Sequence, residues 1–193
     1  MTFSARLATL AALVSLGIGH NLALAAGNAE RGQTLAYTCL GCHGIENYRN
    51  AYPTYDVPKL VGQHPEYIVA ALKGYKSAER SHATMHAHAS SMTDQDMADI
   101  AAYLSGTPIQ SSGLTPVGTA PKAAQVCVSC HGTDGVGITA DYPTLAGQHA
   151  SYLSRALTDY KRGGRKNPIM ANFAAQLSDA DIAELAHYFS QQK

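Results

Sequence analysis

The stretch Cys39-Leu-Gly-Cys-His43 and its copy Cys127-Val-Ser-Cys-His131 decide the fold of this 193-residue chain. Both have the Cys-x-x-Cys-His spacing that is typical of c-type haem attachment. In such a segment each cysteine can form a thioether with a haem vinyl group, and the histidine then lies beside the iron as an axial ligand. The two stretches therefore predict two covalently bound haem c groups. The predicted attachment points are Cys39, Cys42, Cys127 and Cys130, and the predicted proximal ligands are His43 and His131.

Three other uses of paired cysteines fit the sequence less well. A single zinc site would need two cysteine pairs about 15–20 residues apart, whereas these pairs are 88 residues apart. A thioredoxin-like thiol pair would need a βαβ context, and the chain has no convincing period-2 strand pattern. Four cysteines could form disulfides in three pairings, but a disulfide framework does not need a histidine directly after each pair.

An internal repeat places the two motifs at equivalent points of a duplicated unit. The segment Pro58-Lys-Leu-Val-Gly-Gln-His-Pro-Glu-Tyr67 reappears as Pro143-Thr-Leu-Ala-Gly-Gln-His-Ala-Ser-Tyr152. Residues 58–76 and 143–161 are identical at ten of 19 positions, at an offset of 85. Because self-similarity at a fixed offset indicates repeated structural units, the sequence predicts two homologous domains.

The boundary between the predicted domains follows from composition. Residues 106–120 are rich in Gly, Pro, Ser and Thr and lack apolar periodicity, which is typical of a linker. We therefore predict a first domain at 26–105 and a second at 121–193.

The first 25 residues have the pattern of a secretory signal peptide. Arg6 supplies a positive charge, an apolar run covers residues 7–18, and Ala23-Leu-Ala25 is a small-x-small cleavage signal. We predict a signal peptide at 1–25, cleavage near Ala25 or Ala26, and export of the mature chain. The alternative is an uncleaved membrane anchor, but the apolar run is shorter than the roughly 20 residues that span a bilayer.

The rest of the pattern indicates an all-α fold. Helices are predicted at 27–37, 65–75 and 150–160. Thr93 and Ser178 each precede an acidic residue that would stand third in the following helix, which resembles a capping box. Apolar residues recur behind both at spacings of three and four, as on the buried face of a helix. A domain of this size buries little surface, so a covalent haem would supply an apolar body around which short helices pack.

A methionine or a histidine could supply the sixth iron ligand, and Met/His ligation raises the reduction potential. Met170 is the only methionine in the second half, and the repeat aligns it with Met85. We therefore predict that Met170 and Met85 are the axial ligands opposite the two histidines. The alternative ligands near Met85 are His82, His86 and His88.

Pro58 and Pro143 stand at the same point of the repeat, downstream of each attachment motif. A metal-binding histidine usually donates its other ring N–H to a carbonyl or a carboxylate. The Pro58 carbonyl could orient His43 in this way, and the Pro143 carbonyl could orient His131. The alternative is that both prolines only shape turns.

Together these features resemble the cytochrome c4 family, which are periplasmic di-haem proteins built from two class I cytochrome c domains. The resemblance covers essentially the whole mature chain. It rests on Cys39-Leu-Gly-Cys-His-Gly44, Pro58-Lys-Leu-Val-Gly-Gln63, Thr93-Asp-Gln-Asp-Met-Ala-Asp-Ile-Ala-Ala-Tyr-Leu104 and their second-half copies. It implies that each domain is a few short helices wrapped around one haem with His/Met ligation.

The resemblance also implies the partners. Members of the family accept single electrons from a donor such as a cytochrome bc1-type complex or a dehydrogenase. They pass them to an acceptor such as a terminal oxidase, and peripheral association with membrane complexes fits that role. Nucleic acid is not an expected partner, because 14 basic and 14 acidic residues leave no strongly basic region. The one dense basic run, at 161–166, is interpreted as a solvated loop, and a partner-docking patch is the alternative.

Three features depart from the family pattern, and one of them is the histidine-rich stretch around Met85. The first haem loop carries an insertion at 48–55, and Ala120 stands where Gly32 stands in the first half. The packing of the first helix in the second domain is therefore left open.

Three functional hypotheses follow, of which we favour the first. In the first, two six-coordinate haems leave no open iron position, and the protein is an electron carrier without enzymatic activity. In the second, it is a di-haem peroxidase or thiosulfate dehydrogenase, or the dedicated redox partner of such an enzyme. A peroxidase would need Met85 away from the iron, and the known type of thiosulfate-oxidising site would need a spare cysteine. In the third, it is a docking subunit of a larger complex.

Overall fold

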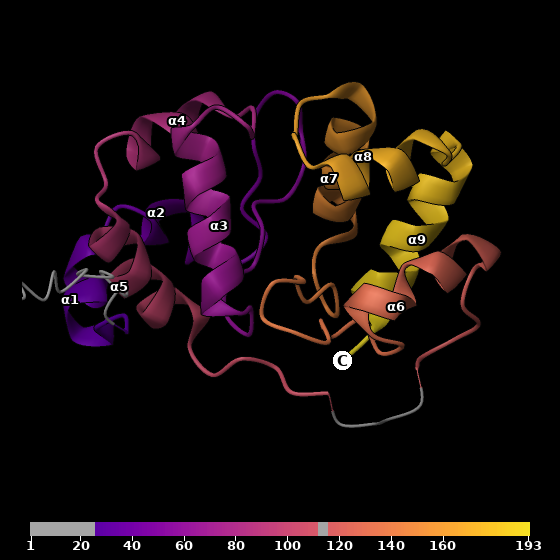
Figure 1. The fold of residues 1–193 in the computed structure, drawn as a ribbon, viewed down its shortest axis with the longest axis horizontal. Helices are drawn as coiled ribbons and strands as arrows, with labels where there is room; N and C mark the ends of the chain where they lie inside the picture. Colours follow the sequence, from indigo (N-terminus) through magenta and orange to yellow (C-terminus); the bar gives the residue numbers. More distant parts are fainter. Residues whose placement is uncertain (1–25, 112–115) are drawn as a thin grey trace, which may run out of the picture.

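The computed structural model describes residues 26–111 and 116–193 (Figure 1). The predicted signal peptide and part of the predicted linker, at 112–115, lie outside the described residues. Within the two described ranges the chain is helical, and its only β structure is two isolated bridges, so the predicted all-α fold is confirmed there. None of the described helices is both long and apolar enough to cross a bilayer.

The helices form two groups, one from each half of the chain. In the first half they are α1 (Ala29–Leu35), α2 (Leu40–His43), α3 (Pro65–Lys76), α4 (Ala83–Ala89) and α5 (Asp94–Ser105). In the second half they are the 3₁₀ helix η1 (Lys122–Val126), α6 (Val128–His131), α7 (Ala150–Arg162), α8 (Pro168–Ala175) and α9 (Asp179–Gln191). Figure 1 shows the two groups side by side, with α3 and α7 nearest the boundary between them.

The repeat is visible in the packing as well as in the sequence. α3 packs against α4 and α5, and α7 packs against α8 and α9 in the same way. The predicted capping boxes are both present, since Thr93 and Ser178 each exchange hydrogen bonds with the third residue of their helix. The predicted helices at 65–75 and 150–160 are confirmed as α3 and α7, each extending one or two residues further.

The first domain contains a close contact between α1 and α5 that glycine makes possible. A Cβ added at Gly32 would lie 1.9 Å from the carbonyl oxygen of Asp99, and one at Gly27 would lie 2.1 Å from that of Ala98. Neither distance is compatible with a side chain, so α1 can approach the α5 backbone only because both residues are glycine. The carboxylate of Asp99 then accepts a hydrogen bond from the backbone N–H of Asn28 at 2.8 Å, which ties the start of α1 to α5.

The second domain has no α-helical counterpart of α1. The chain before its attachment motif forms only the short 3₁₀ helix η1, which packs against α9 and α6. Ala120, at the position of Gly32, precedes η1 and lies outside any helix. The sequence left open how the first helix of the second domain packs. In the part of the second half that the structure describes, no such α-helix forms before the attachment motif, and the core of the second domain is built without it. That core consists of Ala124, Leu153, Leu185, Ala186, Tyr188 and Phe189.

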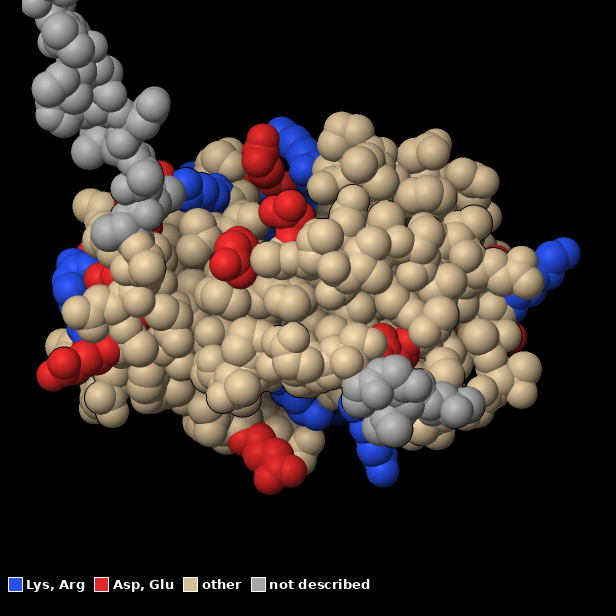
Figure 2. Space-filling view, turned by 60° about the horizontal axis from the view of Figure 1, so that its bottom comes forward, with Lys and Arg blue, Asp and Glu red and all other residues tan. Residues whose placement is uncertain are grey.

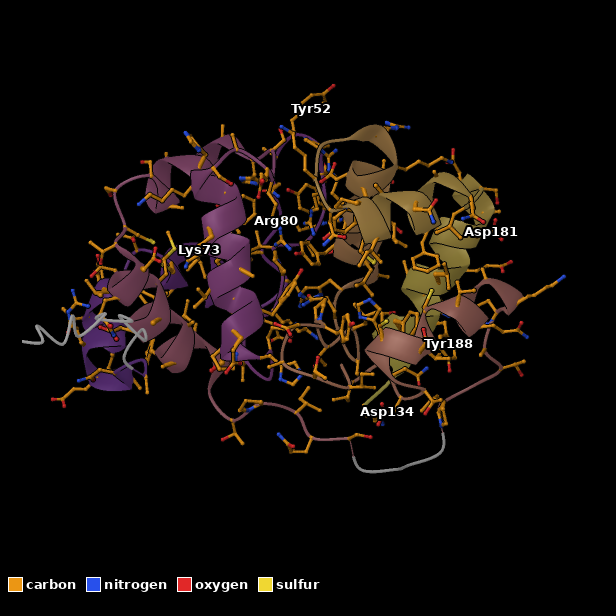
Figure 3. All side chains as sticks on the ribbon, in the orientation of Figure 1. Tyr52, Lys73, Arg80, Asp134, Asp181 and Tyr188 are labelled. Atoms are coloured by element: carbon orange, nitrogen blue, oxygen red, sulfur yellow. The ribbon has the colours of Figure 1, made fainter. Side chains whose placement is uncertain are left out.

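The insertion in the first haem loop contributes to the boundary between the domains. Tyr52 is 95% exposed and points away from the molecule (Figure 3), whereas Tyr55 is buried. The guanidinium of Arg155, on α7, lies 5.7 Å from the centre of the Tyr55 ring. The neighbouring Asp56 exchanges hydrogen bonds with the hydroxyl of Ser151, also on α7. The extra residues of the first domain are thus used as a contact with the second.

The described part of the predicted linker follows the surface of both domains. The N–H of Ile109 donates to the carbonyl of Gly62 in the first domain at 2.9 Å. The hydroxyl of Ser111 donates to the carboxylate of Asp134 in the second domain at 2.6 Å. These two bonds hold the connecting segment against the two halves that it joins.

Candidate functional site

The two attachment motifs form single helical turns, α2 and α6. Cys39 and Cys127 stand at the N-caps, so the second cysteine of each pair follows one turn later on the same side of the helix. All four thiols are free in the structure. Burial raises the pKa of the Cys39 and Cys127 thiols, which therefore stay protonated at neutral pH. The spacing presents two thiols and a histidine to one side, as attachment to the edge of a flat cofactor requires.

Each motif histidine is held by the carbonyl of a proline. Nδ1 of His43 lies 2.9 Å from the oxygen of Pro58, and Nδ1 of His131 lies 2.9 Å from that of Pro143. A carbonyl oxygen can only accept, so Nδ1 must carry the proton in both rings. Burial lowers the pKa of both imidazoles, so each ring is neutral at pH 7 and Nε2 keeps its lone pair. Nε2 is therefore the atom available to a metal.

One cavity of about 780 Å³ joins the two halves of the molecule. Its volume falls in the range of about 300–1,000 Å³ that is usual for cofactor pockets. Its walls are mostly apolar and include Ile100 and Leu104 from α5 and Leu185 and Phe189 from α9. All eight predicted attachment and axial residues line it: Cys39, Cys42, His43, Met85, Cys127, Cys130, His131 and Met170.

The two methionines occupy the same position in equivalent helices. Met85 is the third residue of α4, and its N–H donates to Nδ1 of His82 at 3.2 Å. Met170 is the third residue of α8, and its N–H donates to Oδ1 of Asn167 at 3.0 Å. The offset of 85 aligns His82 with Asn167, so each methionine is positioned by an equivalent N-capping contact.

The geometry gives other roles to the histidines near Met85. Nδ1 of His82 accepts a hydrogen bond, so in the neutral ring Nε2 carries the proton and has no lone pair for iron. Nδ1 of His86 lies 2.7 Å from the carbonyl oxygen of Tyr75. Neither His86 nor His88 lines the cavity. Of the four candidate ligands in this segment, Met85 is therefore the one whose donor atom is free at the cavity wall.

Two arginines that sequence reasoning missed lie at the boundary between the domains, and both line the cavity. Arg80 and Arg165 form an isolated antiparallel bridge through their backbones, and Figure 3 shows Arg80 between the two groups of helices. Arg165 is 6% exposed, so the interpretation of the 161–166 run as a solvated loop was wrong for this residue. The repeat offset of 85 relates the two arginines and could have identified them.

Both guanidiniums lie over tyrosine rings. Arg80 is 5.2 Å from the ring centre of Tyr67 and donates to its hydroxyl at 2.7 Å. Arg165 is 5.3 Å from the ring centre of Tyr152 and donates to its hydroxyl at 3.2 Å. Burial raises the pKa of Tyr67, and that of Tyr75 to about 12, so these phenols are neutral and do not balance the charge of Arg80.

The two cations at the boundary, Arg165 buried and Arg80 half-buried, fit a cofactor that carries carboxylates. A buried charge is costly unless it is paired, and no carboxylate among the described residues forms an ion pair with Arg80. Arg165 has only Asp159, at 3.9 Å. Haem carries two propionate groups, which would supply the missing negative charge. The cavity wall carries thiols, histidines, apolar side chains and guanidiniums, and this set matches the chemistry of haem c.

Both halves of the chain match known families of cytochromes. Residues 29–108 match the family described as Cytochrome c, and residues 120–189 match that described as Cytochrome C oxidase, cbb3-type, subunit III. A cytochrome c4 of Pseudomonas aeruginosa is 36% identical over 192 residues, which cover 91% of this chain and 94% of the relative. A thiosulfate dehydrogenase electron acceptor of Stutzerimonas stutzeri is 30% identical over 174 residues, 80% of this chain and 79% of the relative.

The fold is also that of a solved relative. The crystal structure of reduced recombinant cytochrome c4 from Pseudomonas stutzeri has a TM-score of 0.68 and 32% sequence identity, over 87% of this chain and 100% of that one. The sequence identity, the share of each chain that is covered and the shared fold all indicate the same family. The chain therefore belongs to the cytochrome c4 family and is a di-haem electron-transfer protein, with one covalent haem c in each of its two cytochrome c domains.

Proposed function

We propose that this protein carries single electrons in the periplasm, from a donor such as a cytochrome bc1-type complex or a dehydrogenase to an acceptor such as a terminal oxidase. The proposal includes the axial ligands, which are His43 with Met85 in the first domain and His131 with Met170 in the second. When bound, each haem supplies reversible one-electron exchange at its iron. The chain supplies the ligands, the apolar enclosure and the charges that set the reduction potential.

One observation carries this proposal. In each half a histidine with a free Nε2 and a methionine on a capped helix line the same cavity, at equivalent points of the repeat. Two protein ligands on each iron leave no coordination position for a substrate. That favours a carrier over a peroxidase, which needs an open iron.

We also propose a maturation step and the boundaries of the two domains. The signal-peptide pattern at 1–25 supports export and cleavage near Ala25 or Ala26. The composition of 106–120 supports domains at 26–105 and 121–193. Mass spectrometry of the protein purified from the periplasm would give the mature N-terminus directly, and a retained segment 1–25 would contradict cleavage.

A second candidate role is that of dedicated acceptor for a thiosulfate dehydrogenase. It is favoured by the 30% identity to a relative with that name. In this role too the chain transfers electrons without binding the sulfur substrate, because all four cysteines belong to the attachment motifs. The two roles differ in the donor, so the rate at which each donor reduces the purified protein separates them.

The surface offers a constraint on how a partner docks. The face in Figure 2 is mostly uncharged, and its Lys, Arg, Asp and Glu side chains are interspersed. A patch of one sign would steer an oppositely charged partner and make association depend strongly on ionic strength. If docking uses this face, the rate of electron transfer will change little with salt concentration.

The ligand assignment is tested by replacing the methionines one at a time. Met85→Ala and Met170→Ala should each remove about half of the charge-transfer absorption of Met-ligated ferric haem, and each should leave the other haem low-spin. Met92→Leu is the matched control, because the repeat places Leu177 at that position and the substitution keeps the packing. Full loss of the band in Met170→Ala alone would show that Met85 is not a ligand.

Turnover assays test the absence of enzymatic activity. The unaltered protein should not consume peroxide at a catalytic rate, whereas Met85→Ala opens one iron and should gain slow peroxide consumption. Rapid peroxide turnover by the unaltered protein would refute the carrier role.

A further inference from the structure

The Gly-Gln element of the repeat has a contact that the proposed function does not use. Each glutamine reaches across the domain boundary to the backbone of the other domain. Oε1 of Gln148 accepts from the N–H of Lys59 at 3.0 Å, and its Nε2 donates to the carbonyl of Lys59 at 2.9 Å. In return, Oε1 of Gln63 accepts from the N–H of Thr144 at 2.9 Å, and its Nε2 donates to the carbonyl of Thr144 at 2.9 Å.

The orientation of both side-chain amides is determined by their surroundings. Oε1 of Gln63 also accepts from the N–H of His64 at 3.0 Å, and Oε1 of Gln148 from the N–H of His149 at 3.1 Å. An oxygen that faces two N–H groups cannot be exchanged with the NH₂ group without losing both bonds. Both glutamines are also buried, at 8% exposure, so water does not compete for these contacts.

The peptide group that each glutamine contacts is the one that holds the haem histidine of the opposite domain. Pro58 C=O and Lys59 N–H belong to the same amide. Its oxygen faces Nδ1 of His43, and its N–H faces Oε1 of Gln148. The Pro143–Thr144 amide connects His131 to Gln63 in the same way. A single amide therefore separates each histidine from a glutamine of the other domain.

We propose that Gln148 is a positioning residue for His43 and that Gln63 is one for His131, so that each domain adjusts the iron ligand of the other. An N–H that donates to a good acceptor polarises its amide, and the carbonyl oxygen then becomes a stronger acceptor. A stronger bond to Nδ1–H gives the imidazole more imidazolate character and makes it a better donor to a metal. A better donor favours the ferric state and lowers the reduction potential. The inference rests on His43 and His131 as iron ligands.

The arrangement makes the domain boundary part of both haem sites. Any motion that separates Gln148 from Lys59 weakens the bond to His43, and separation of Gln63 from Thr144 weakens the bond to His131. Opening the boundary should therefore raise both reduction potentials together. A partner that docks across this boundary would have a direct route to both irons.

The test is a crossed pair of substitutions, Gln148→Leu and Gln63→Leu, in the complete holoprotein. The two haems are followed separately by NMR during a redox titration, and are assigned by contacts of their methyl groups with Ile100 in the first domain or Phe189 in the second. Gln148→Leu should make the first haem easier to reduce, by about two- to fivefold in its redox equilibrium constant. Gln63→Leu should do the same to the second haem. In each variant the haem of the glutamine's own domain should change less.

Two controls separate positioning from simple loosening of the boundary. Ser151→Ala removes the contact with Asp56 at the same boundary but leaves both amides intact, so both potentials should stay near their original values. Gln148→Glu keeps an oxygen in front of the Lys59 N–H, so the potential of the first haem should stay at or below its original value. Gln148→Glu also provides the comparison if Gln148→Leu does not accumulate as folded holoprotein.

Failure of the ligand assignment and failure of the glutamine proposal would give different results. The hyperfine-shifted Nδ1 protons of two iron-bound histidines should be visible in the unaltered protein, and their absence would refute the ligand assignment itself. If they are present but each substitution shifts both haems equally, or neither, the glutamines do not act through the histidines. A rise in potential in Gln148→Glu equal to that in Gln148→Leu would also overturn the inference.

Discussion

Arg80 and Arg165 meet across the domain boundary as a backbone bridge, with each guanidinium over the tyrosines of its own domain. Two cations brought together at this boundary would repel each other. Tyrosine rings face both of them, and the adjoining cavity fits a cofactor with carboxylates. The bridge therefore places two positive charges beside the cofactor space of both domains.

Removing one of these cations should make a haem harder to reduce. A positive charge near an iron favours the reduced state, so Arg80→Met is expected to lower a reduction potential. It should also lower the free energy of unfolding by about 1–3 kcal/mol, through loss of the hydrogen bond and the ring contact with Tyr67. Potentiometric titration and denaturant unfolding of the holoprotein measure the two effects.

Lys73→Met is the matched control for that experiment. Lys73, which Figure 3 labels, is on α3 in the same domain and pairs with Asp94 at 2.7 Å, but its side chain is 42% exposed and does not line the cavity. Its removal deletes one positive charge with little effect on either potential, because solvent screens exposed charges. Equal shifts in the two variants would mean that only net charge matters.

Gly32→Ala should destabilise the first domain. The new methyl group would have to move α1 away from the carbonyl of Asp99, at a cost of about 1–3 kcal/mol that is typical of overpacking. Thermal unfolding followed at each haem should show the first domain melting earlier. Gly41→Ala is the control, since a Cβ there meets no atom within 4 Å and the second motif has Ser129 at that position. An unchanged melting temperature in Gly32→Ala would contradict the packing of α1 on α5.

His82 should be replaceable by asparagine but not by alanine. His82→Asn copies Asn167, which caps α8 in the second domain, so Met85 should stay on the iron. His82→Ala removes the cap, which typically costs about 1 kcal/mol of helix stability. Met85 should then be displaced at lower concentrations of added imidazole. Loss of the Met charge-transfer band in His82→Asn would instead assign an iron-binding role to His82.

The capping boxes predict a loss of stability in acid. Bonds from the Thr93 hydroxyl and backbone N–H and from Arg31 lower the pKa of Asp96 to about 2. Because the pKa is about 3.9 in an unfolded chain, the contribution of Asp96 is complete above about pH 4. It is lost as the pH falls from about 4 to about 2.

Asp96→Asn tests that window. The melting temperature of the first domain should depend less on pH between about 4 and 2 in the variant than in the unaltered protein. Asp181, whose pKa the Ser178 cap lowers in the same way, makes the equivalent Asp181→Asn a probe of the second domain. If Asp96→Asn and the unaltered protein lose stability in parallel, the carboxylate does not make this contribution.

Local features could be predicted from the sequence, and contacts between domains could not. Short-range patterns predict the capping residues Thr93 and Ser178, the helices that begin at Pro65 and Ala150, and the all-α class. The fate of the first helix of the second domain did not follow, because the glycine that permits close packing is recognised only once its neighbour on α5 is known. The roles of Gln63 and Arg80 were missed for a related reason. A repeat shows which residues are equivalent, but it does not show how two copies are turned against each other.

The reciprocal glutamine contacts have a consequence for the two halves as separate proteins. A single half on its own would leave its proline amide facing water, and its buried glutamine and arginine would lose their surroundings. The structure of each half therefore depends in part on residues of the other half. Separating the two halves at the linker should not yield two independent mono-haem carriers.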